Sequence, residues 1–203
     1  QTPGENAQRY FAKYNKQKRT FEALTELIQE TADDIQYLES ISNALDIALN
    51  EADLAQIKEE LMQSGYIRRK HTKKKVKLTS KPMHYISSDG YDMYVGKNNL
   101  QNEELTFSFA NGNDWWFHAK GAPGSHVIVK SGGDELPDRT FEEAGRLAAY
   151  YSKNRGADKV EIDYIQKKHI KKPNGAKPGF VVYYTNYSLV IDSDISNIKK
   201  VQD

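Results

Sequence analysis

The sequence predicts an α+β protein in which a long coiled-coil helix precedes a mainly antiparallel β-sheet domain with one principal helix. Two observations carry this prediction. Residues 5–50 contain no Gly or Pro and are rich in Ala, Glu, Gln, Lys and Leu, a composition typical of long helices. From Met83 onward, short apolar and β-branched runs alternate with Gly, Asn and Pro turns, and one segment alone has the spacing of an amphipathic helix.

The overall composition excludes several classes of function. The chain has 203 residues, a net charge of +1 and no cysteine, so disulfides, Cys-ligated zinc and thiol catalysis are ruled out. There is no signal-peptide pattern, and no apolar run approaches the roughly 20 residues that span a bilayer. We therefore expect a cytoplasmic protein. Because the first residue is Gln1 rather than Met, we also expect a fragment of a longer protein.

The N-terminal helix carries a narrow apolar stripe of the coiled-coil kind. Steps of four and three residues reach twelve positions, of which three are polar. Such a stripe requires a partner helix, which either belongs to a missing part of the same protein or comes from a second copy. The positions are Tyr10, Tyr14, Gln17, Phe21, Leu24, Ile28, Thr31, Ile35, Leu38, Ser42, Leu45 and Leu49.

A short second helix and a basic segment follow this arm. The helix is expected over residues 52–64 and ends at Gly65. Seven Lys or Arg residues then lie between Arg68 and Lys77. Such a block repels itself unless an anion neutralises it, so it is either an RNA-contacting linker or a solubilising one. We divide the chain into a coiled-coil arm (1–65), a basic linker (66–82) and a globular domain (83–203).

The globular domain begins with two predicted hairpins. Residues 83–87 and 91–97 form the first around Asp89-Gly90, and residues 105–110 and 114–119 form the second around Asn111-Gly112-Asn113. Thr140 and Glu143 predict a capping box at the start of the principal helix. Further strands are expected at residues 125–130, 159–166, 180–185 and 187–192.

The segment from Asp114 to Val127 holds two tryptophans, two histidines, a lysine and a Pro-Gly turn. Its aromatic side chains either stack on bases or form an ordinary core hairpin. Strand alternation places Trp116 and His118 on one face and Trp115 and Phe117 on the other. We predict that Trp116 and His118 face the ligand.

An enzymatic reading rests on the same segment. His118 and His126 flank a turn, with Asp114 nearby, as acid-base or metal groups would. However, the sequence has no HExxH, P-loop, Gly-x-Ser-x-Gly or paired-carboxylate motif. We expect no catalysis by this chain, no metal and no cofactor.

A second basic loop, residues 167–179, combines lysines with Pro and Gly. Its turn residues give it a defined shape, which suits a phosphate site better than a mobile chain does. An ordinary charged surface loop remains the alternative.

Several sequence blocks of the globular domain carry a resemblance to a known domain. The blocks are Val95-Gly96-Lys97-Asn98-Asn99-Leu100, Asp114-Trp115-Trp116-Phe117-His118, Pro123-Gly124-Ser125-His126-Val127, Ala148-Ala149-Tyr150-Tyr151-Ser152, Lys171-Lys172-Pro173 and Gly175-Ala176-Lys177-Pro178-Gly179. With these blocks, the domain from residue 83 resembles the NFACT-R domain of the NFACT proteins of the bacterial fibronectin-binding-protein A type. Residues 6–16 resemble the descending coiled-coil helix of the same proteins.

This resemblance implies a ribosome quality control factor. Such proteins bind stalled large ribosomal subunits with peptidyl-tRNA and recruit alanyl-tRNA for C-terminal alanine tailing, which the ribosome performs. The implied partners are the large ribosomal subunit with its rRNA, tRNA, and the missing coiled-coil helix of the same protein. The alternative is an anchorless surface adhesin that binds fibronectin, with some of the protein on the cell surface.

The predicted RNA-contacting residues combine the basic segments with the aromatic hairpin. They are Arg68, Arg69, Lys73, Lys74, Lys75, Lys97, Asn98, Trp116, His118, Lys120, His126, Lys168, Lys171, Lys172 and Lys177.

Overall fold

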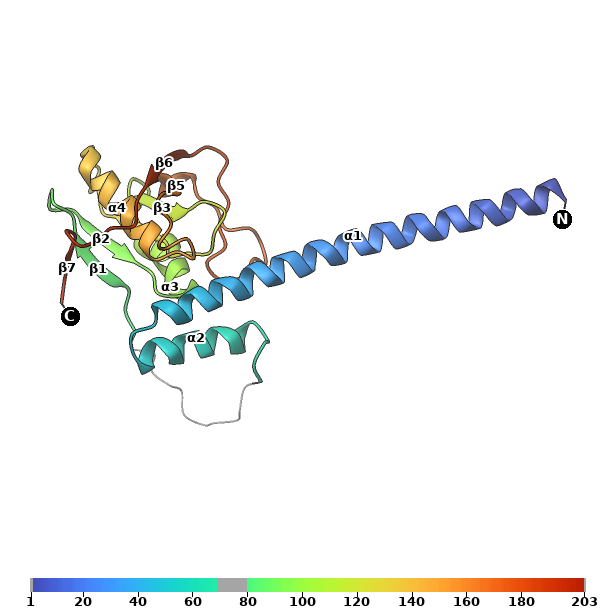
Figure 1. Ribbon diagram of the computed structural model, residues 1–203, viewed down its shortest axis with the longest axis horizontal. Helices are drawn as coiled ribbons and strands as arrows, with labels where there is room; N and C mark the ends of the chain where they lie inside the picture. The colour runs from blue at the N-terminus through green and yellow to red at the C-terminus, as the bar shows by residue number, and fades with distance from the viewer. Residues whose placement is uncertain (1, 69–79, 203) are drawn as a thin grey trace. The chain divides into compact units, whose positions relative to one another are not determined.

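The computed structural model describes residues 2–68 and 80–202, and its chain divides into two compact units, Gln1–Leu38 and Glu39–Asp203. Helix α1 (Pro3–Ile47) provides all of the described part of the first unit except Thr2, and its last residues belong to the second. This confirms the predicted long helix (Figure 1). No helix among the described residues is long and apolar enough to cross a membrane.

The predicted apolar stripe of α1 lies in solvent. Phe21 is 72% exposed and Ile28 69% exposed, and every apolar position of the stripe exposes at least two fifths of its surface. Apolar side chains in water are unfavourable in free energy unless another helix covers them. The stripe therefore has the character of one half of a coiled coil.

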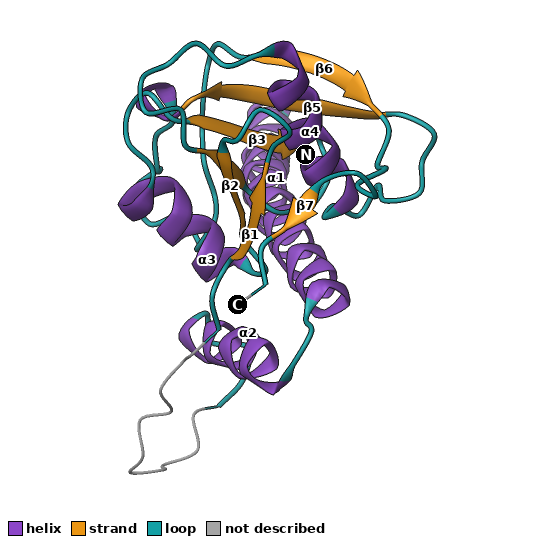
Figure 2. Ribbon diagram, turned by 90° about the vertical axis from the view of Figure 1, so that its left-hand side faces the viewer, coloured by secondary structure: helices purple, strands orange, loops and turns teal. Residues whose placement is uncertain are grey.

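The second unit is built on a seven-stranded sheet in which every paired neighbour is antiparallel. The spatial order is β6-β5-β3-β4-β2-β1-β7. Figure 2 shows β6 and β5 toward one edge of the sheet and β1 and β7 toward the other. The α+β fold with a mainly antiparallel sheet is thus confirmed. The strands are β1 (Met83–Ile86), β2 (Asp92–Val95), β3 (Trp115–Ala119), β4 (Val127–Val129), β5 (Val160–Gln166), β6 (Tyr187–Ile191) and β7 (Lys199–Lys200).

Helix α4 (Asp138–Tyr150) covers one face of this sheet. Its Ala144, Leu147 and Ala148 are fully buried with Phe117 and Val127 in the larger core. Gly145 lets the helix approach β6 closely, because a Cβ at this position would lie 2.9 Å from a Leu189 methyl group, which would have to shift. The predicted principal helix is therefore present, and it packs on the sheet through its apolar face.

The opposite face carries a smaller core. Helix α3 (Asn99–Glu104) runs directly into a π-helical turn, η1 (Leu105–Phe109). Leu105 and Ala110 pack with Trp116 and Ile128 on this face. A 3-10 turn, η2 (Lys167–His169), and Ile170 complete the cover after β5.

Three local predictions were wrong. The strand predicted at residues 105–110 is absent, and residues 105–109 form η1 instead, because Asn98 caps α3 by accepting from the Gln101 N–H at 2.9 Å and the chain continues as a helix. Residues 180–185 make a single bridge, between Lys171 and Val182. The third error concerns the capping box of the principal helix.

Helix α4 begins two residues before the predicted cap. Pro137 is the N-cap residue, and Thr140 lies inside the first turn. The Thr140 hydroxyl donates to Asp89 at 2.8 Å, and the Glu143 carboxylate accepts from the Ser88 N–H at 2.8 Å. Both side chains thus bind the β1–β2 turn instead of each other's backbone.

Helix α2 (Glu51–Gln63) confirms the predicted short second helix. Its Asn50 cap accepts from the Asp53 N–H at 3.0 Å. Through Asp53, Gln56 and Glu60, all at most 8% exposed, α2 turns a polar face toward α3. Polar contacts, rather than apolar packing, therefore join these faces of α2 and α3.

Candidate nucleic-acid interface

The aromatic strand β3 has the predicted alternation but not the predicted exposure. Trp116 and His118 share one face, with ring centroids 5.6 Å apart and nearly parallel planes. Trp116 is nevertheless 0% exposed, since η1, Ile170 and Tyr183 cover it. The expectation that Trp116 faces a ligand is wrong, because both faces of the sheet are covered at β3.

His126 is a core residue, whereas His118 is only partly buried at the sheet surface. His126 is 3% exposed, its Nδ1 lies 2.8 Å from the Thr106 hydroxyl, and its ring meets that of His118 edge-on at 5.4 Å. Burial lowers the pKa of His118 to about 4, although the charge of Asp163 opposes this shift. Burial and the neighbouring His118 likewise hold the pKa of His126 well below its ordinary value. Both rings are neutral at pH 7.

Asp114 does not join these histidines. Its carboxylate accepts from Lys130 Nζ, from the Ser131 N–H at 3.2 Å and from the Asn111 N–H at 2.7 Å. No group of three or more metal-ligating side chains occurs among the described residues. The contacts of Asp114 are those of a residue that shapes a turn.

Lys97 and Asn98 were expected at the surface, but the structure buries both. Lys97 is 7% exposed, and its Nζ lies 2.6 Å from the Asp53 carboxylate. Asn98 is 3% exposed and donates to the Gln56 side chain at 2.7 Å. The Lys97 ammonium and the Asn98 amide, which were predicted to contact RNA, are instead bonded to α2. Neither side chain is therefore accessible to a phosphate.

The remaining predicted cations within the described residues reach solvent. Lys168 and Lys171 are exposed, and Lys172 pairs with Glu103 at 2.6 Å. Lys177 donates to the Tyr66 hydroxyl at 2.9 Å, and Lys120 pairs with Glu161 at 2.5 Å. Arg68 is exposed at the end of the first described segment. The other predicted linker cations, Arg69, Lys73, Lys74 and Lys75, lie outside the described residues.

The basic loop after η2 has a fixed backbone. Lys171 and Val182 exchange two backbone hydrogen bonds, both 2.9 Å long. Gly179 donates to Glu103 at 3.2 Å, and its φ of 77° is in the region that favours glycine. The predicted shape of this loop is therefore confirmed, and its lysines project from a defined scaffold.

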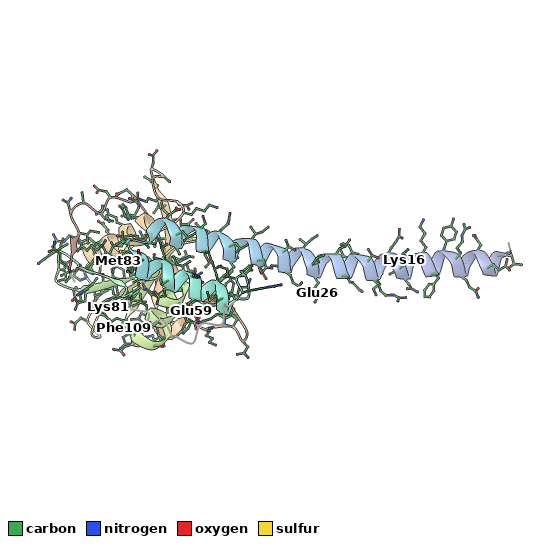
Figure 3. All side chains as sticks on the ribbon, turned by 90° about the horizontal axis from the view of Figure 1, so that it is seen from below. Lys16, Glu26, Glu59, Lys81, Met83 and Phe109 are labelled. Carbon is green, nitrogen blue, oxygen red and sulfur yellow. The ribbon has the colours of Figure 1, made fainter. Side chains whose placement is uncertain are left out.

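An aromatic cluster that was not predicted from the sequence lies on the face of the sheet opposite α4. Phe109, which is labelled in Figure 3, is 40% exposed. Its ring meets that of Tyr94 edge-on at 4.7 Å, and Tyr94 stacks on His84 at 4.5 Å. Lys130 Nζ lies 4.8 Å from the centre of the Phe109 ring. The cluster was missed because residues 105–110 were predicted to be a strand. In a strand, Phe107 and Phe109 would lie on the same face, so nothing would have set Phe109 apart.

Two family models together match residues 1–185, which include all four α-helices of the described residues and most strands of the sheet. The NFACT N-terminal and middle domains match residues 1–80, and the NFACT protein RNA binding domain matches residues 81–185. The relative named Rqc2 homolog RqcH from Streptococcus pneumoniae is 45% identical over 99% of this chain and 36% of its own length. The protein of the same name from Bacillus subtilis is 39% identical over 99% of this chain and 35% of its own length.

A solved structure has the same fold. It is the C-terminal of the fibronectin/fibrinogen-binding protein from Streptococcus suis, which is 42% identical with a TM-score of 0.89 over 99% of this chain and 81% of that one. The chain spans about a third of the length of the curated relatives that it matches. From these matches, the chain belongs to the NFACT family, and residues 81–185 match the RNA binding domain of that family.

Proposed function

We propose that this chain is the RNA- and ribosome-binding part of a ribosome quality control factor. In this proposal the whole protein binds stalled large ribosomal subunits with peptidyl-tRNA and recruits alanyl-tRNA for alanine tailing. The observation that carries the proposal is the fixed lysine-rich loop of the RNA-binding domain. Both B. subtilis and S. pneumoniae relatives bear the name Rqc2 homolog RqcH, which supports the same reading.

The loop is suited to a phosphate backbone because its cations are held before binding. The Lys171–Val182 bridge and the Gly179–Glu103 bond fix the two ends of the lysine run. A fixed backbone loses less conformational entropy on binding than a mobile one. The lysine side chains then supply the charge that displaces counterions from RNA.

The ion pair of Lys172 does not remove that lysine from the interface. Its side chain is 36% exposed and that of Glu103 30% exposed, so water screens the attraction between them. Partly exposed pairs of this kind contribute little to stability. An RNA phosphate can therefore replace Glu103 at small cost.

The proposed role is that of a binder, without catalysis by this chain, in the cytoplasm. The two histidines support this role, because their lowered pKa values leave both rings uncharged at pH 7, so neither holds an extra proton for a general acid to donate.

Filter binding of rRNA and of tRNA across a salt series tests the proposal. Lys171→Glu with Lys172→Glu should weaken binding and lower the salt slope by about two, since each phosphate contact contributes about one. Lys73→Glu, Lys74→Glu and Lys75→Glu test the linker in the same way. Lys153→Glu with Lys159→Glu is the control, because both lysines are exposed in the connection between α4 and β5. Unchanged affinity in a variant with all five substitutions at residues 73–75, 171 and 172 would refute the role of the basic segments.

Fibronectin binding is the second candidate, favoured by the description of the S. suis structure alone. A pull-down of purified chain with immobilised fibronectin tests it. Retention at physiological salt that survives the five-lysine substitution would support an adhesive role independent of RNA.

A further inference from the structure

The aromatic cluster on the face opposite α4 presents one ring outward. Phe109 is the last residue of η1, and the residue is 40% exposed although its ring meets that of Tyr94 at 4.7 Å. Below it, Tyr94 and His84 stack with planes 2° apart. π-helical turns occur often at functional sites, since they displace a side chain from its regular helical position. The turn here supports an exposed aromatic ring on two packed ones.

A lysine is held beside that ring. Lys130 Nζ lies 4.8 Å from the centre of the Phe109 ring and 3.3 Å from the Phe109 carbonyl oxygen. The same ammonium group pairs with the buried carboxylate of Asp114. The pair is neutral as a whole, so it fixes the position of Phe109 and Asp114 rather than attracting a phosphate by itself.

Asp114, which pairs with Lys130, also lines a surface recess of about 290 Å³. Two glycines, Gly132 and Gly133, form one wall with φ angles of 63° and 98°. Two asparagines contribute amide groups, which both donate and accept hydrogen bonds. The full lining is Asn111, Gly112, Asn113, Asp114, Gly132 and Gly133.

The basic turn η2 borders the recess on its other side. The Lys168 N–H donates to the Gly112 carbonyl at 3.0 Å, and the Lys167 N–H donates to the Asp114 carbonyl at 2.9 Å. The Lys168 side chain is exposed. An exposed ring, a recess with amide groups and a cation are therefore contiguous along residues 109–114, 130–133 and 167–168.

We propose that this surface binds one unpaired nucleotide of single-stranded RNA. The base stacks on Phe109, its polar edge meets the amides of Asn111 and Asn113, and its phosphate meets Lys168. Unstacked bases are recognised through such combinations of an aromatic ring and edge hydrogen bonds, which a paired base does not offer. The inference rests on the proposed RNA-binding function and specifies which form of RNA this surface selects.

The volume and the charge distribution favour this occupant. The recess of about 290 Å³ is at the lower limit of ordinary ligand pockets, about 300–1,000 Å³, and Phe109 does not line it, so it suits the polar edge of a base stacked on that ring rather than a larger ligand. Asp134 follows Gly133, so acidic charge lies on that side, whereas Lys167 and Lys168 lie on the other. A nucleotide phosphate is therefore placed on the η2 side.

Fluorescence anisotropy with the full chain tests the proposal, using an unstructured 12-nucleotide RNA and a blunt 12-base-pair RNA duplex. Phe109→Leu keeps an apolar side chain but removes the aromatic face. Stacking of one base is worth about 1–3 kcal/mol, so the variant should bind the single strand roughly tenfold more weakly and the duplex unchanged. Phe109→Trp should retain or improve single-strand binding. Equal affinity of the wild type and Phe109→Leu for the single strand would overturn the proposal.

Further variants separate this site from the general function and from a folding defect. Asn113→Ala lies in an exposed turn and should also weaken single-strand binding alone. Tyr184→Ala is the matched aromatic control, because Tyr184 is 86% exposed, and it should bind like the wild type. If Lys171→Glu with Lys172→Glu weakens both RNAs while Phe109→Leu and Asn113→Ala weaken neither, the nucleotide site is refuted and the RNA-binding function stands. If the wild type binds neither RNA at low salt, both fail.

Discussion

Replacing Lys97 by Met should destabilise the second unit by about 3 kcal/mol, because it leaves a buried carboxylate without its cation. The side chains of Lys97 and Asp53 are 8% and 1% exposed, and 2.6 Å separates their charged atoms. Removing one partner of a buried pair costs about 3–5 kcal/mol. The Ser80 hydroxyl and the Leu49 N–H still donate to Asp53, at 2.5 and 2.9 Å, so the lower end of that range applies.

Urea unfolding followed by tryptophan fluorescence measures this change, since Trp115 and Trp116 both lie in the second unit. With a slope of about 1–3 kcal/mol per molar urea, the midpoint should fall by about 1 M or more. Lys120→Met is the matched control. It removes the same side chain from a 2.5 Å pair with Glu161, but these side chains are 49% and 48% exposed, so the midpoint should stay almost unchanged.

The pH dependence of the urea midpoint tests the role of the Asp53 charge in the same variant. Burial raises the pKa of Asp53, but the bonds from Lys97, Ser80 and Leu49 outweigh it and hold that pKa below 3.8. The wild type therefore keeps the stabilisation above pH 3.8 and loses it as the pH falls toward the lower folded value. Without Lys97, burial dominates and the carboxyl takes up a proton at higher pH, so the two midpoints should converge in acid. A midpoint that matches the wild type at pH 7 would refute the reasoning.

Two further predictions concern the core around β3. The domain should lose stability as the pH falls from 6.5 toward 4, because the unfolded chain protonates His118 in this range and the folded chain does not. The expected loss in the free energy of unfolding is on the order of 3 kcal/mol. Urea titrations at several pH values measure this loss, and His118→Gln should reduce it. Gly96→Ala should destabilise the domain by roughly 1–3 kcal/mol, since a Cβ there would lie 2.2 Å from the Asn102 side-chain oxygen. Gly112→Ala, with a nearest contact of 3.6 Å, should leave the thermal midpoint close to that of the wild type, and equal losses in the two variants would contradict this account.

The sequence was sufficient for the long helix, its apolar stripe and most strands. These features depend on local signals: helix composition over residues 5–50, a repeat of four and three, and alternation between turns rich in Gly and Asn. The resemblance of several blocks to NFACT proteins was confirmed for the same reason, because it rests on the residues themselves.

The tertiary structure alone decided which of the chemically versatile residues are accessible. Alternation correctly paired Trp116 with His118, but no local rule reveals that η1 and the chain after β5 cover that face. Lys97 looks like a surface cation until α2, more than thirty residues earlier in the chain, supplies Asp53. Phe109 became a candidate contact because a helix cap at Asn98 starts a helix that ends in a π turn. Burial is a property of contacts between segments distant in sequence, so the sequence determined the chemistry of these side chains and the fold decided which of them reach solvent.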